Sequence, residues 1–220
     1  MKTKKSNGAV KERIPAAVTK KTVRQKTSSV KKSKAEPDYE DVEDESAEVS
    51  SDNIKPKKGQ LEKFLIDGLK DLYWAEQHLL KALMEMAAES TSEELRQAFK
   101  DHRIETEDHV SRLEEIFEML GEKAEGKKCD AIEGIIKEVK SLIDETNDDT
   151  LTRDAALIIG GQKAEHYEIA SYGGLIQVAR SLGHNEAAEL MEDTLAEEKQ
   201  ADDNLTSIAE EVVYQHAIME

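Results

Sequence analysis

The stretch LEKFLIDGLKDLYWAEQHLLKALMEMAAES (residues 61–90) decides the fold. Its large apolar residues recur at steps of three and four, which is the period of an amphipathic α-helix. These residues are Leu65, Leu69, Leu72, Leu79, Leu83 and Met86. The following Thr91-Ser92-Glu93-Glu94 has the pattern of a helix cap with a capping-box acid. We therefore expect a second helix to begin directly after the first.

The rest of the chain predicts three more helices, and no proline follows Pro56. The second helix ends at Gly121, and a shorter one is expected over about 130–145. Thr150 or Thr152 can cap a long helix that ends at Leu182-Gly183. Asn185 can cap the last helix, which we expect to fray after Tyr214.

The lengths of the connections predict how these helices are joined. The first and second long helices, and the third and fourth, are linked by two or three residues, so each pair is an antiparallel hairpin. The link from Gly121 to Asp149 contains its own helix and is long enough to run the length of a bundle. We predict an all-α protein, a ferritin-like four-helix bundle over residues 59–220 with this helix-containing crossover. A plain up-down bundle with a fifth helix packed outside is the alternative.

The net charge of the chain is −17, but positive and negative residues are concentrated in separate segments. Residues 1–34 carry twelve Lys or Arg and one acid, and residues 35–52 carry nine acids and no base. With few large apolar residues, residues 1–58 cannot offset their ordering entropy, so we expect a disordered tail. Residues 59–220 carry −22. The basic block 1–34 is the one region suited to bind DNA through phosphates. The alternative is a tail that solubilises the protein, or that folds back on its own acidic block or on the acidic domain.

Several other classes of protein are excluded. One cysteine, Cys129, rules out an internal disulfide framework and a CxxC metal site. No apolar run of about 18 residues is present, so we expect no membrane span. The basic start lacks an apolar h-region, so no secretory signal is predicted and we expect a cytoplasmic protein.

Acidic residues interrupt the apolar stripe of each long helix. The stripe of the second helix is predicted to include His102, Glu105 and His109, and that of the fourth Glu198 and Asp202. Glu76 interrupts the first helix and Glu165 and Glu168 the third. Counting from the turns at 1.5 Å per residue places Glu76, Glu105, Glu168 and Glu198 at one level, roughly 20 Å from the turns.

Buried carboxylates at one level need a compensating charge, since desolvation and mutual repulsion oppose their ionisation. A pair of metal ions supplies that charge, and carboxylates with an occasional imidazole suit iron or manganese. The predicted ligands are Glu76, Glu105, His109, Glu165, Glu168, Glu198 and Asp202, with either or both of Glu165 and Glu168 binding. His102 is expected to hydrogen-bond to Glu105 without contacting the metal, and direct ligation by His102 is the alternative.

Four segments carry a resemblance to a known family: DLYWAEQHL, FKDHRIETEDHVSRLEEIFE, QKAEHYEIASYGGL and LAEEKQADDNLTSIAEE. Together they resemble the YciF-like family of ferritin-like bacterial stress proteins, over about residues 60–213. The resemblance implies a di-iron-carboxylate bundle, often a homodimer, associated with stress. Asp202 departs from the histidine that the wider superfamily places there.

Two functions follow as hypotheses. The first is a stress-associated protein with two iron ions, or manganese, that acts on peroxide or oxygen as a non-haem oxidoreductase. The second is a non-catalytic, protective bundle whose basic tail binds DNA or a protein partner.

Overall fold

The computed structural model describes residues 58–220. Residues 1–57 of the predicted tail, which include its basic and acidic blocks, lie outside the described residues. The described part is helical and contains no strand. Its elements are α1 (Lys58–Glu89), α2 (Glu93–Leu120), α3 (Asp130–Glu145), α4 (Leu151–Leu182), α5 (Asn185–Ile208), a π-helical turn (Ala209–Val213) and α6 (Tyr214–Ala217).

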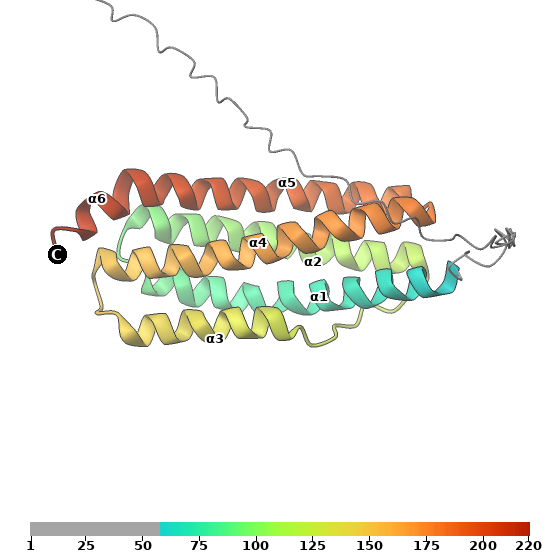
Figure 1. Ribbon diagram of the computed structural model, residues 1–220, viewed down its shortest axis with the longest axis horizontal. Helices are drawn as coiled ribbons and strands as arrows, with labels where there is room; N and C mark the ends of the chain where they lie inside the picture. The colour runs from blue at the N-terminus through green and yellow to red at the C-terminus, as the bar shows by residue number, and fades with distance from the viewer. Residues whose placement is uncertain (1–57) are drawn as a thin grey trace, which may run out of the picture. The chain divides into compact units, whose positions relative to one another are not determined.

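The four long helices form a closed ring in which α1 packs against α2 and α4, and α5 packs against the same two helices. The short α3 packs outside this ring, on α4 and α1 (Figure 1). α2 and α4 begin at the same end of the bundle, where Asp154 of α4 accepts hydrogen bonds from Thr91 and Ser92 (Figure 1). Because a plain up-down bundle would start these helices at opposite ends, the crossover topology is confirmed.

The helix ends follow the predicted boundaries, but two of the predicted caps are wrong. The carboxylate of Asp154, at 2.7 and 2.8 Å, accepts from the backbone N–H groups of Thr91 and Ser92, and no side chain of the Thr91–Glu94 stretch caps α2. Asn185 is the first residue of α5, and His184 precedes it without a side-chain cap. Thr150 caps α4 as predicted, because its hydroxyl accepts from Arg153 N–H.

The C-terminal residues are held rather than frayed. The helix continues through the π-helical turn to Ala217. The Glu220 carboxylate then accepts from the backbone N–H groups of Leu151 and Thr152, at 2.8 and 3.1 Å. These N–H groups begin α4 and have no partner within the helix, so a carboxylate stabilises them.

The apolar core is divided in two along the bundle axis. One cluster gathers residues such as Leu69, Ile116 and Met191, and the other gathers residues such as Met86, Phe99 and Leu205. Helix α3 adds a third cluster on the outside, where Ile132 packs with Leu79 and Ala164. The two main clusters leave a level between them that polar side chains occupy.

Candidate metal centre

Six ionisable residues of the described part of the chain lie at this level, and as whole residues none is more than 7% exposed. Each long helix contributes at least one of them. They are Glu76 on α1, His102 and His109 on α2, Glu165 and Glu168 on α4, and Glu198 on α5. We call this set the carboxylate–histidine layer.

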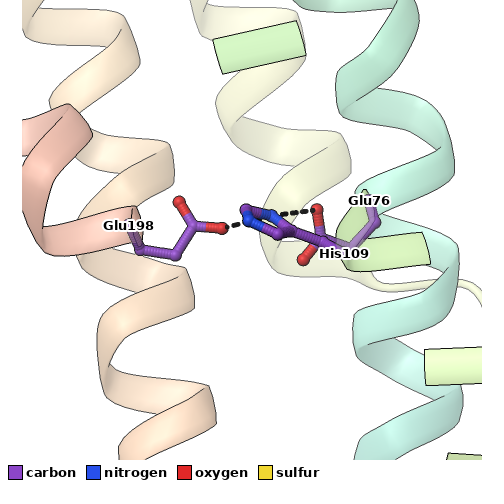
Figure 2. Close-up of side chains that lie close together, drawn as sticks. All are labelled: Glu76, His109 and Glu198. Atoms are coloured by element: carbon purple, nitrogen blue, oxygen red, sulfur yellow. Dashed lines mark ion pairs between the residues drawn. The ribbon is translucent and has the colours of Figure 1, made fainter. Parts of the chain in front are cut away.

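The first group in the layer joins Glu76, His109 and Glu198. His109 Nδ1 lies 2.9 Å from Glu198 Oε1 and 3.5 Å from Glu76 Oε2. Figure 2 shows the imidazole ring between the two carboxylates, which come from α1 and α5. Three ligand atoms from three helices therefore converge on one place.

The second group joins His102, Glu165 and again Glu198. His102 Nε2 lies 3.3 Å from Glu165 Oε2 and 3.5 Å from Glu198 Oε2. Glu198 thus turns one oxygen to each group, and the two histidine rings lie 6.1 Å apart between their centroids. This is the arrangement of a carboxylate that can bridge two ions.

The layer lacks the hydrogen bonds that buried polar atoms normally make. Among the described residues, eight buried side-chain polar atoms have no hydrogen-bond partner, and six of them belong to the layer. They are Glu76 Oε2, His109 Nδ1, Glu165 Oε2, Glu168 Oε1 and both carboxylate oxygens of Glu198. Because an unmet buried acceptor costs about 1–3 kcal/mol, and more when charged, these atoms fit a metal ligand set.

Burial and neighbouring charges raise the pKa of several groups in the layer, which favours their protonated forms; these groups are Glu76, His102, His109, Glu168 and Glu198. Burial raises the pKa of Glu198 to about 7, and contact with His109 opposes that shift. Burial raises the pKa of Glu168 well above its usual range, and the Glu198 and Glu76 carboxylates raise it further. Burial lowers the pKa of His109, but Glu198 and Glu76 outweigh it and raise the pKa to about 10. The layer therefore holds positive charge strongly, as protons or as metal ions.

Further residues hold the ligands in position. The Tyr172 hydroxyl donates to Glu76 Oε1 at 2.5 Å. His109 Nε2 lies 3.0 Å from Glu197 Oε2, and Arg112 binds both oxygens of Glu197. A metal-binding histidine commonly donates its other N–H to a carboxylate in this way.

Sequence reasoning missed Glu197 and Arg112. Each lies on an α-helix, next to the stripe of residues that face the core. A charged residue at such a position is normally exposed to solvent, so neither was predicted to take part in the site. A weak signal was present, since Arg112 is three residues after His109 and so shares its side of the helix.

The structure brings five of the seven predicted ligands together: Glu76, His109, Glu165, Glu168 and Glu198. It does not bring Glu105 and Asp202 into the layer. The Glu105 side chain is 48% exposed and contacts His102 Nδ1 at 3.2 Å. The side chain of Asp202, on α5, is turned towards α4, where it accepts from Gln162 at 3.3 Å and lies 3.4 Å from His166 Nδ1.

His102 has a different place from the one expected. The sequence predicts that it hydrogen-bonds to Glu105 without contacting a metal. In the structure its Nε2 faces Glu165 and Glu198 inside the layer, and only its Nδ1 contacts Glu105, at the outer side. His102 is thus positioned as a direct ligand, which was the alternative.

The fold and the layer define a class: the ferritin-like four-helix bundles, with carboxylates and histidines at mid-height. Residues 60–218 match the family described as "Domain of unknown function (DUF892)", and the chain belongs to this family. Protein YciF of Escherichia coli strain K12 is 43% identical over 150 residues, which cover 68% of this chain and 90% of YciF. The resemblance to YciF-like proteins is therefore confirmed.

Solved structures agree with this assignment. The E. coli stress protein YciF superposes with a TM-score of 0.66 at 40% identity, covering 73% of this chain and 98% of that one. YcfI from Rhodopseudomonas palustris gives a TM-score of 0.66 at 39% identity, covering 72% and 98%. Within residues 58–220, no helix is both long enough and apolar enough to cross a membrane.

Proposed function

We propose that the carboxylate–histidine layer binds two iron ions and that the protein uses them to reduce peroxide or dioxygen under stress. Manganese is the other ion that this ligand set suits. The stress role rests on the description of the relative YciF as a stress protein. The homodimer and the cytoplasmic location implied by the resemblance and the sequence are part of the same proposal.

The observation that carries the proposal is the position of Glu198. One of its oxygens faces the group of Glu76 and His109, and the other faces the group of His102 and Glu165. Apart from the imidazoles of His109 and His102, neither oxygen has a polar partner within hydrogen-bonding distance that satisfies it. Glu76, His109 and Glu198 would hold one ion, and His102, Glu165 and Glu198 the second, with Glu168 completing the charge balance.

When bound, a pair of iron ions supplies two electrons, one from each ion, which is the number that reduction of a peroxide requires. The protein's own residues prepare the site for this chemistry. Tyr172 fixes Glu76, and Glu197 fixes the ring of His109. The apolar clusters on both sides keep bulk water out, which strengthens the electrostatic interactions within the layer.

Metal content per chain tests the binding step. We expect two ions per wild-type chain, and loss of both in Glu198→Gln, which keeps the shape of the side chain and removes its charge. Glu192→Gln is the matched control, because Glu192 is on the same helix and pairs with Arg180 at the surface. Two ions in Glu198→Gln would overturn the proposal.

Peroxide consumption by the Fe²⁺-loaded protein tests the reaction. We expect one peroxide consumed, with two protons taken up and two water molecules formed, for every two ferrous ions oxidised to ferric. Iron that binds stoichiometrically but reacts no faster than free Fe²⁺ would favour the non-catalytic, protective function instead.

A further inference from the structure

A small pocket of about 70 Å³ opens between α2 and α5 and reaches the carboxylate–histidine layer. Its volume is on the scale of a few water molecules. The polar part of its lining is Asp101, His102, Glu105, Glu165 and Asn204, and Ala98 and Ala201 are among its apolar walls. The pocket therefore connects a surface carboxylate with two of the buried ligands.

Other sides of the layer are covered. Helix α3 packs Ile132 over the side formed by α1 and α4. Between α4 and α5, Gln162 donates to Asp202 and to Thr206. Further along the face between α2 and α5, Arg112 and Glu197 lie over His109.

Ligand atoms form a continuous series through the pocket. The side chain of Glu105 is 48% exposed, that of His102 8% and that of Glu165 2%. Glu105 Oε2 lies 3.2 Å from His102 Nδ1, and His102 Nε2 lies 3.3 Å from Glu165 Oε2. Apart from this contact with His102, Glu165 Oε2 has no hydrogen-bond partner, so the inner end of the series is a buried carboxylate oxygen that can accept a cation.

We propose that this pocket is the route by which a divalent cation enters the layer, with Glu105 as the first carboxylate that it meets. The inference rests on the proposed function, since it concerns the loading of the same site. Asp101 and Glu105 attract the hydrated ion, and the narrow apolar walls require it to exchange water for Glu105, His102 and Glu165 in turn. Glu105 is thereby a transient contact rather than a permanent ligand.

The test is the rate at which the metal-free full-length protein takes up Co²⁺, followed by the change in visible absorption. Glu105→Gln removes the charge at the mouth, and Ala98→Leu narrows the opening at a half-buried position on α2. The control is Ala196→Leu, at an exposed position on α5 that does not line the pocket. We expect Glu105→Gln to load about tenfold more slowly, which is the scale of electrostatic steering. Ala98→Leu should also load more slowly, because the opening is narrower, and the control should load as wild type.

The amount bound at equilibrium separates the outcomes. Wild-type stoichiometry in all three variants, with slow loading in the first two, supports the route. Wild-type rates in both pocket variants overturn it while leaving the proposed function intact. Loss of an ion in Glu105→Gln also overturns it, because Glu105 would then be a permanent ligand. If the wild-type protein binds no Co²⁺ at all, the proposed function fails, and this inference with it.

Discussion

Glu197 Oε2 lies 3.0 Å from His109 Nε2, on the side of the imidazole that faces away from Glu76 and Glu198. Arg112 holds Glu197 through both carboxylate oxygens. Because a carboxylate accepts, Nε2 is the nitrogen that keeps its proton when a metal binds. Nδ1 is then free to give its lone pair to an ion between Glu76 and Glu198.

Replacing Glu197 is therefore expected to weaken metal binding without removing a ligand. Glu197→Ala should lower the affinity of the Glu76–His109 group about 10- to 100-fold, and Glu197→Gln, which can still accept from Nε2–H, should lower it less. Titration of metal-free protein with Mn²⁺ measures both. Equal affinity in wild type and Glu197→Ala would contradict the positioning role.

Tyr172 is expected to act on Glu76 in a similar way. Burial raises the pKa of Tyr172 well above its usual range, so the hydroxyl stays protonated and donates to Glu76. Tyr172→Phe should reduce metal affinity about tenfold. Tyr73→Phe is the matched control, because Tyr73 is close in sequence to Glu76 but donates to Glu114. If the two variants bind metal alike, Tyr172 has only a structural role.

The metal-free protein should lose stability as pH rises. The folded-state pKa of Glu198 is raised from 4.5 to about 7, so its stabilising contribution is complete below about pH 4.5 and is lost as pH rises through 7. His109, raised from 6.5 to about 10, contributes below about 6.5 and loses this as pH rises through 10. We expect the thermal midpoint to fall between pH 5 and 9, and added Mn²⁺ to restore it. A midpoint that rises over this range would contradict the expectation.

Asp154 is expected to be a structural residue of the bundle end. Its carboxylate is buried and holds the turn between α1 and α2 through the N–H groups of Thr91 and Ser92, so Asp154→Ala leaves these two N–H groups without a partner. The cost should be about 3 kcal/mol, or roughly 10 °C in the thermal midpoint of a chain of this size. Asp203→Ala, at an exposed position on α5, is the control and should change the midpoint little.

DNA binding by the basic block remains a prediction from the sequence, because residues 1–34 lie outside the described residues. We expect the full chain to retard duplex DNA in gels at low salt, with binding that weakens steeply as salt is raised. A variant lacking residues 1–58 should not bind. Absence of a shift with the full chain at low salt would remove nucleic acid from its partners.

The periodicity of the sequence was sufficient to predict the helices and the level of the layer. Glu76, Glu168 and Glu198 interrupt apolar stripes at matching distances from the two turns, and helical rise alone converts those distances into depth. The length of the Gly121–Asp149 link predicted the crossover, because a connection to the far end of a bundle needs that many residues. These features depend on the rise per residue, which is the same along the whole of an α-helix.

The rotational phase of the helices around the layer depended on packing. After His102, steps of three and then four residues lead through Glu105 to His109, whereas steps of four and then three lead through Thr106, and a period of 3.6 permits both. The structure buries Thr106, whose hydroxyl is satisfied by the carbonyl of His102. On α5, Ala201 is buried in the same way and Asp202 is turned towards Gln162.

The sequence by itself thus determined which helices form, how they connect and at what height the acids lie. Only the tertiary structure decided which acids face inward, that His102 joins the ligands, and that Glu197 and Arg112 support His109. The physical reason is that rise along a helix is fixed by its backbone hydrogen bonds. Which side chain is buried among neighbours, by contrast, is settled by the helices packed against it.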